Sequence, residues 1–266
     1  MTQKGSYQFE KLESREREAI FLAERSHLRI EGFDDLLIRH GLATQGRVLE
    51  VGCAQGIRSR LIAAQSRQLQ VIGIDRSDEL LNLAHLQSRG IENLSFQKAD
   101  LYELGFADAS FDFIYARLVF MHLSEPLRAL KSLKRVLKPG GRILIEDADR
   151  DCMFFEPEPP SFSDFWSKVQ AGQRALGGDP NIGRKLASYF KESGFEQIKI
   201  ETQPILGEGK EIEFLVRTLM PSLNKYLDPA DRAKGAEAIE DLYQLAQDPR
   251  AHFYHFWFVV SACQSS

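Results

Sequence analysis

The chain has 266 residues, of which 43% are hydrophobic and 27% are charged, a balance typical of a soluble globular protein. Its formal net charge of −4 argues against a nucleic-acid partner, because no overall basic field would attract phosphate. Three widely separated cysteines, Cys53, Cys152 and Cys263, indicate neither a zinc site nor a disulfide framework. Residues 1–18 lack the apolar core of a signal peptide, and no apolar run is long enough for a membrane helix. We therefore expect a cytoplasmic protein without membrane contact.

The predicted elements of the first half alternate between helices and strands. Residues 10–28 and 32–40 are expected to be helices, and they form an N-terminal segment, 1–45. Short apolar runs predict strands at 47–51, 69–74, 94–97, 111–116 and 142–146, and helices are expected at 57–64, 78–89 and 126–137. This alternation predicts a doubly wound α/β fold, in which a mostly parallel sheet has helices on both faces.

The second half is less regular. The expected elements are a proline-rich loop at 156–160, helices at 162–176, 183–193, 212–219 and 229–247, and strands at 195–202 and 252–260. We interpret 149–180 and 203–250 as insertions that cap one edge of the sheet. No linker divides the sequence, so residues 1–266 are expected to form a single domain.

A glycine-containing turn, EVGCAQG at residues 50–56, lies between the first predicted strand and the next helix. Glycines let the backbone turn sharply and approach a ligand, and the helix that follows offers free N–H groups. Such a turn by itself is equally compatible with a purely structural role.

Acidic residues at the ends of the next two strands strengthen the case for a nucleotide-like ligand. Asp75 ends the second strand, where a carboxylate can accept hydrogen bonds from two ribose hydroxyls. Its alternative role is to cap the following helix, for which Ser77 and Asp78 are better placed. Asp100, after the third strand, is either an acceptor for an adenine amino group or a solvated loop acid.

Four motifs resemble those of class I S-adenosylmethionine-dependent methyltransferases. They are VLEVGCAQG at 48–56, VIGIDRS at 71–77, ASFDFIYA at 109–116 and LKRVLKPGGRILI at 133–145, and together they cover residues 46–147. The Gly194-Phe195 pair and the aromatic last strand are similar to later units of the family. The resemblance implies a seven-stranded sheet of order 3-2-1-4-5-7-6 with an antiparallel last strand.

The resemblance also implies a role for individual residues toward the cofactor S-adenosylmethionine. It implies that the methionine part of the cofactor is bound by Glu50, Gly52, Cys53, Ala54 and Gly56. It also implies that Asp75 binds the ribose, that Asp100, Leu101 and Arg76 contact the adenine, and that Arg117 lies near the methyl end. Ala54 replaces the usual second glycine of the family, which is tolerable if its φ is negative. A nicotinamide dinucleotide is disfavoured, because its motif would need a third glycine where Ile57 stands.

The methyl acceptor is expected beyond the carboxyl ends of the strands. His122 is there either a general base or a packed histidine. Asp147 and Asp149 either orient the acceptor or are solvated loop acids, and they supply too few oxygen ligands for a metal site. Tyr7 either closes over the cofactor or belongs to a disordered tail. Arg25 and His27 either face the cleft or lie at the surface, and surface exposure is favoured. A group of aromatic residues either lines an apolar acceptor pocket or packs the insertion onto the sheet, namely Phe154, Phe155, Phe162, Phe165 and Trp166.

The leading functional hypothesis is methyl transfer to oxygen or nitrogen of a small-molecule acceptor by a monomer or homodimer. A protein or RNA methyltransferase is the second hypothesis, although no basic patch supports RNA. A cofactor-binding relative without transfer activity is the third, and its main support is Ala54.

Overall fold

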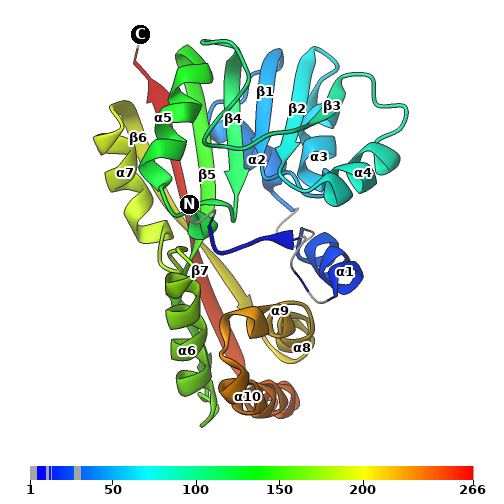
Figure 1. The fold of residues 1–266 in the computed structure, drawn as a ribbon, viewed down its shortest axis with the longest axis vertical. Coiled ribbons are helices and arrows are strands. Elements are labelled where there is room, and N and C mark those ends of the chain that lie inside the picture. The colour runs from blue at the N-terminus through cyan, green and yellow to red at the C-terminus, as the bar shows by residue number, and fades with distance from the viewer. Residues whose placement is uncertain (1–4, 10–11, 13, 27–30, 266) are drawn as a thin grey trace.

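The computed structural model describes residues 5–9, 12, 14–26 and 31–265 (Figure 1). His27 and parts of the helix expected at 10–28 lie outside the described residues. The two N-terminal helices are α1 (Arg15–Ser26) and α2 (Phe33–Arg39).

A seven-stranded sheet of order β3-β2-β1-β4-β5-β7-β6 forms the centre of the molecule, which confirms the expected order. Its strands are β1 (Gly46–Val51), β2 (Leu69–Asp75), β3 (Leu94–Lys98), β4 (Phe111–Arg117), β5 (Leu137–Glu156), β6 (Phe195–Gly207) and β7 (His252–Gln264). The first five strands pair in parallel, whereas β7 lies antiparallel between β5 and β6. The carboxyl ends of the parallel strands therefore meet at one edge of the sheet, where open α/β sheets bind ligands.

Helices cover both faces of the parallel part of the sheet. The helices here are α3 (Ile57–Gln65), α4 (Asp78–Gln87), α5 (Pro126–Val136) and α7 (Leu186–Glu192). On one face of the sheet, apolar residues of α2 and α3 form a buried cluster with every second strand residue. On the other face, apolar residues of α5 and α7 form a second cluster with the strand residues in between. The period of two along each strand divides its side chains between these two cores.

Strands β5, β6 and β7 extend well beyond the parallel part of the sheet. The predicted strand at 142–146 is too short, because β5 continues to Glu156 within the segment interpreted as an insertion and pairs there with β7. A bulge between Ala148 and Met153 interrupts the register and places polar residues inside the strand. The sequence pattern of this part therefore resembles that of a loop. Likewise β6 runs to Gly207, beyond the predicted residue 202.

The cap is built on these strand extensions. It comprises α6 (Phe162–Ala175), α8 (Gly209–Thr218), α9 (Met220–Leu223) and α10 (Arg232–Leu245), with short 3₁₀-helices η4 (Asn224–Tyr226) and η5 (Pro229–Asp231). Its helices share a separate apolar core with Met153, Phe155 and Phe253 of the strands. Figure 1 shows them gathered at the lower end of the molecule. The two predicted insertions thus meet in one cap.

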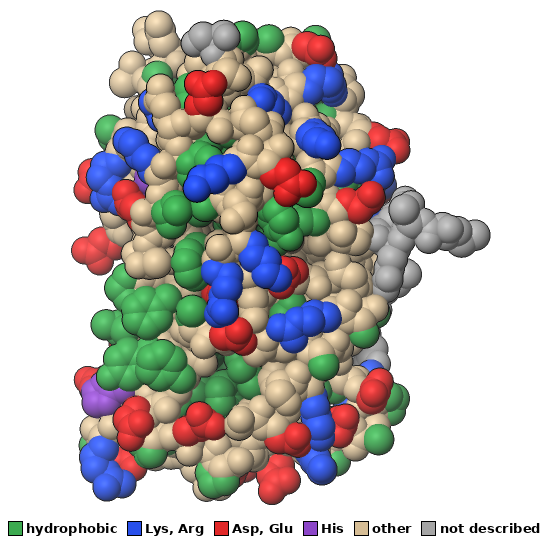
Figure 2. Space-filling view, turned by 90° about the vertical axis from the view of Figure 1, so that its left-hand side faces the viewer, with side chains coloured by type: hydrophobic (Ala, Val, Ile, Leu, Met, Phe, Trp, Pro, Cys, Tyr) green, Lys and Arg blue, Asp and Glu red, His purple; other side chains and the backbone are tan. Residues whose placement is uncertain are grey.

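The cap helices do not cover the outer face of the strand extensions, where several apolar side chains are exposed. Phe154 of β5 is 44% exposed and stacks on Tyr254 of β7. Leu206 and Ile200 of β6 are also exposed. Figure 2, which views the side of the molecule that carries β6 and α7, shows a patch of hydrophobic side chains among charged ones.

Candidate functional site

The turn after β1 adopts a left-handed backbone at three positions. Gly52, Ala54 and Gly56 have φ values of 67°, 47° and 70°, and Gly56 begins α3. A Cβ atom on Gly52 would lie 2.5 Å from Val119 Cγ2, so glycine is required there. The condition set for Ala54, a negative φ, is not met. Its methyl group is held in a conformation that costs an alanine about 1–2 kcal/mol.

Asp75 fixes this turn from the neighbouring strand. Its carboxylate accepts hydrogen bonds from the backbone N–H groups of Ala54 and Ser77, both at 3.0 Å. The alternative that Asp75 caps α4 is wrong, because Ser77 accepts the hydrogen bond from the backbone N–H of Leu80. The carboxylate at the end of β2 is thus held against the glycine turn.

Glu50 places a buried carboxylate at the end of β1. Its side chain accepts a hydrogen bond from Ser59 Oγ. Burial raises the pKa of Glu50 to about 7, although the positive charges of Arg58 and Arg117 oppose this shift. Glu50 therefore changes its charge near neutral pH.

One cavity of about 1010 Å³ connects these motifs with the cap. Its volume lies at the upper end of the range for small-molecule sites. The expected cofactor residues that line it are Glu50, Gly52, Cys53, Ala54, Asp75, Arg76, Leu101 and Arg117. Gly56 and Asp100 lie outside the lining. Gly56 packs closely against Phe96, and the Asp100 carboxylate accepts a hydrogen bond from the Tyr102 backbone N–H.

Three of the residues expected at the acceptor, Tyr7, His122 and Trp166, also line the cavity. The disordered-tail alternative for Tyr7 is wrong, because its hydroxyl donates to Glu18 Oε1 at 3.2 Å and its ring lies 5.2 Å from that of His122. Trp166 both lines the cavity and packs in the cap core.

His122 lies in the 3₁₀-helix η2 (Phe120–His122) after β4. Its Nδ1 is 3.1 Å from Ser6 Oγ and 3.4 Å from the Tyr226 hydroxyl. Burial, with the positive charges of Lys225, Arg150 and Arg25, holds the pKa of His122 well below its ordinary value. The imidazole is therefore neutral and faces the cavity.

The remaining acidic and aromatic candidates lie outside the cavity lining. Asp147 is buried, and its carboxylate accepts the backbone N–H of Met121 at 3.2 Å, which fixes the turn that carries His122. Asp149 is buried and ion-paired with Arg184. The interpretation of both as solvated loop acids is therefore wrong. Phe154 lies on the exposed outer face, whereas Phe155, Phe162 and Phe165 pack in the cap core.

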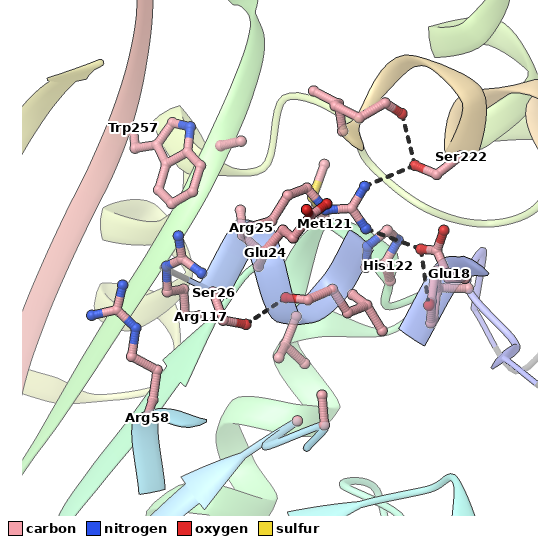
Figure 3. Close-up of a pocket in the computed structure, with 18 of the residues that line it drawn as sticks. Glu18, Glu24, Arg25, Ser26, Arg58, Arg117, Met121, His122, Ser222 and Trp257 are labelled. Atoms are coloured by element: carbon pink, nitrogen blue, oxygen red, sulfur yellow. Dashed lines mark hydrogen bonds and ion pairs between the residues drawn. The ribbon is translucent and has the colours of Figure 1, made fainter. Parts of the chain in front are cut away.

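Arg25 contradicts the expectation of surface exposure. Its side chain is 14% exposed and lines the cavity, where it donates to Ser222 Oγ at 3.1 Å and to Glu18 Oε1 at 3.0 Å. Figure 3 shows this network beside His122, with Arg117 at the end of β4 and Trp257 on β7. The Arg117 guanidinium lies 4.6 Å from the centroid of the Trp257 ring.

Sequence reasoning missed further cavity residues, namely Glu18, Arg150, Ser222, Lys225, Tyr226, His255 and Trp257. Most lie in a helix or strand whose local pattern gives no sign of a site. Within the described part of the chain, no group of three acidic, histidine or cysteine residues could hold a metal ion. None of the described helices combines the length and hydropathy of a membrane span.

Comparison with known proteins agrees with this architecture. Residues 49–145 match a family model described as a methyltransferase domain. Residues 49–145 thus form a methyltransferase domain, as the resemblance to class I S-adenosylmethionine-dependent methyltransferases implies. The methyltransferase resemblance is therefore confirmed, and the cofactor of the family is S-adenosylmethionine.

Individual relatives match only part of this methyltransferase chain. An uncharacterized methyltransferase of Schizosaccharomyces pombe is 33% identical over 154 residues, which are 54% of each chain. The O-methyltransferase resE of Aspergillus sclerotiorum is 31% identical over 57% of this chain and 55% of its own. This chain spans about half the length of such curated relatives.

A solved structure of Haemonchus contortus phosphoethanolamine N-methyltransferase 2 in complex with S-adenosyl-L-methionine is similar in fold. The TM-score is 0.62 at 20% identity, over 98% of this chain and 60% of that one.

Proposed function

We propose that this protein transfers the methyl group of S-adenosylmethionine to an oxygen or nitrogen atom of a small molecule. The observation that carries the proposal is the single cavity that joins the β1 turn and Asp75 to the aromatic, charged cap. When bound, the cofactor supplies a methyl group already activated on a sulfonium, so the protein has to bind, orient and exclude water.

The residues at the sheet end fit this cofactor. Asp75 presents a carboxylate suited to two ribose hydroxyls, and Ala99 and Leu101 supply apolar surface for the adenine. Gly52 has no side chain that would crowd Val119 on the cavity wall. We assign the ammonium group of the methionine part to Glu50, because its buried carboxylate gains from a cationic partner.

The cap end would bind the acceptor. In methyl transfer the bond between methyl and sulfur breaks, a bond from methyl to the acceptor oxygen or nitrogen forms, and the acceptor loses a proton. His122 is our candidate for the group that receives it, because its neutral imidazole faces the cavity. The aromatic walls, with Trp166 and Trp257, keep water from the reacting atoms.

The features of the cavity favour a small acceptor over a macromolecule. Its walls come from α1, the cap and the strand extensions, so an acceptor would be surrounded by protein. The names of similar proteins include both O- and N-methyltransferases, and we leave the acceptor atom open between oxygen and nitrogen.

Two measurements test the proposal. Calorimetry with S-adenosylhomocysteine is expected to give a single binding site, and failure to bind would overturn the proposal. Incubation with methyl-labelled S-adenosylmethionine and separate pools of metabolites, RNA and peptides is expected to label a small organic product. Label in RNA or peptide would favour the macromolecular alternative, whereas binding without transfer to any pool would favour a non-catalytic relative.

A further inference from the structure

Three cationic side chains that are largely shielded from solvent line the cap end of the cavity. Arg25 comes from α1, Arg150 from the extension of β5 and Lys225 from η4, and all three line the cavity. Glu18 is ion-paired with Arg25 at 3.0 Å. Neither Arg150 nor Lys225 forms an ion pair with any carboxylate among the described residues.

The other acidic groups near this end are engaged elsewhere or lie in the solvent. Glu24 pairs with Arg217, and Glu31 and Glu211 are exposed lining residues. Asp147 is buried and accepts backbone N–H groups. Neither Arg150 nor Lys225 is therefore paired directly with a described carboxylate, and the negative charges of Asp147 and Glu18 act on them only through space.

Arg150 is held in place by aromatic rings. Its guanidinium carbon lies 5.2 Å from the ring centroid of Trp166 and 5.7 Å from that of Tyr226. The residue is only 5% exposed, yet its buried Nη1 has no hydrogen-bond partner among the described residues. A buried cationic donor without a partner is costly, so an anion that supplied the partner would be bound favourably.

Lys225 also lies beside two aromatic rings, one of which, that of Tyr226, it shares with Arg150. Its Nζ lies 4.1 Å from the ring centroid of Tyr7 and 5.2 Å from that of Tyr226. Burial, together with the charges of Arg25 and Arg150, lowers the pKa of Lys225 to about 7. An anion at this point would restore the ordinary charge of the ammonium group.

We propose that the methyl acceptor carries an anionic oxygen group, a carboxylate or a phosphate, that binds to Arg150 and Lys225. A guanidinium matches the paired oxygens of either group. Tyr226 touches both cations and its hydroxyl is 3.4 Å from His122 Nδ1, so the anchored end of the acceptor lies beside the candidate base. This inference rests on the proposed function, because it names the class of acceptor for the same cavity.

Matched anionic and neutral probes test this inference on the full chain saturated with S-adenosylhomocysteine. The probes are phenylacetate with its methyl ester, and phenyl phosphate with phenol, titrated by calorimetry at pH 6.5. We expect at least one anion to bind about tenfold or more tighter than its neutral counterpart. The pair with the larger ratio identifies carboxylate or phosphate. Equal affinities within both pairs, including no binding at all, would overturn the inference.

Variants locate the effect. Arg150→Gln and Lys225→Met are each expected to remove most of the preference for the anion and to leave the affinity of the neutral probe unchanged. Lys210→Met is the matched control, because Lys210 also lines the cavity but is exposed. Preference retained in both variants would contradict the proposal.

The melting temperature of each variant and its affinity for S-adenosylhomocysteine show whether it is folded. If Arg150→Gln does not fold, the anion preference of Lys225→Met decides whether the proposed site exists. Wild-type protein that does not bind S-adenosylhomocysteine refutes the proposed function itself. Binding of S-adenosylhomocysteine without anion preference refutes only the anion site.

Discussion

The two ends of the cavity differ in how their residues come together. At the sheet end, Glu50, Gly52 and Ala54 are neighbours in sequence, and Asp75 is brought to them by one parallel strand pairing. At the cap end, Arg25 and Ser222 touch although 197 positions separate them. The comparison teaches that the sheet end is encoded by local motifs at strand ends, whereas the cap end exists only after distant segments pack.

The ends also differ in charge. Glu50 and Asp75 place two carboxylates beside Arg58 and Arg117 at the sheet end. At the cap end, the largely shielded cations Arg25, Arg150 and Lys225 lie near one buried carboxylate, Glu18, which pairs with Arg25. Substitutions at the sheet end should therefore change cofactor affinity, and substitutions at the cap end should change acceptor binding and pH-dependent stability.

The largest effect is expected for Asp75→Ala. The substitution removes a charged acceptor for two hydroxyls and releases the Ala54 N–H, so affinity for S-adenosylhomocysteine should fall about 10- to 100-fold. Calorimetry measures this loss. Asp78→Ala is the control, because Asp78 is exposed and pairs with Lys98. An Asp75→Ala affinity within twofold of wild type would refute the assignment.

At the cap end, Lys225→Met should alter the dependence of stability on pH. The folded-state pKa of Lys225 is about 7 and its ordinary value is 10.5, so between these values only the unfolded chain holds the proton. Wild-type stability should thus gain about 2 kcal/mol from pH 7 to pH 9 relative to the variant. Urea denaturation at both pH values measures the difference. Identical pH slopes in the two proteins would show that Lys225 is not buried as described.

Glu50 gives the sheet end its own pH dependence. Its pKa is about 7, and only the ionised carboxylate attracts the ammonium group of the ligand, so cofactor affinity should weaken as pH falls. Affinity for S-adenosylhomocysteine should fall about tenfold from pH 8 to pH 6. Glu50→Gln should bind more weakly at pH 8 and show little dependence on pH over this range. A wild-type affinity that is constant from pH 6 to pH 8 would exclude this role.

The smallest effect concerns Ala54→Gly. Glycine relieves the left-handed strain but loses more conformational freedom on folding, so we expect a net gain of roughly 0.5 kcal/mol and cofactor affinity within about threefold of wild type. Thermal denaturation and calorimetry measure the two quantities. Ala109→Gly is the matched control, because Ala109 also has a positive φ of 52° but lies outside the cavity lining. A loss of stability in Ala54→Gly alone would mean that its methyl group is needed for packing.

Much of the sheet could be predicted because its signals are local. The apolar runs of β1, β2 and β4 and the acid that ends β2 lie in short, ordered motifs, and a family resemblance supplies the strand order. The extension of β5 could not be predicted, because Asp149, Arg150 and Asp151 interrupt its apolar pattern. They are accommodated by a bulge and by pairing of Asp149 with Arg184, neither of which is visible in one segment of sequence.

The sequence by itself determined the fold class and, through the family resemblance, the cofactor, since the glycine turn and each strand-end carboxylate belong to a short local motif. Only the tertiary structure decided that Arg25 turns inward, that Asp147 supports the His122 turn instead of meeting solvent, and that Arg150 and Lys225 share a wall. The physical reason is that burial and charge balance at these positions depend on side chains contributed by several distant elements.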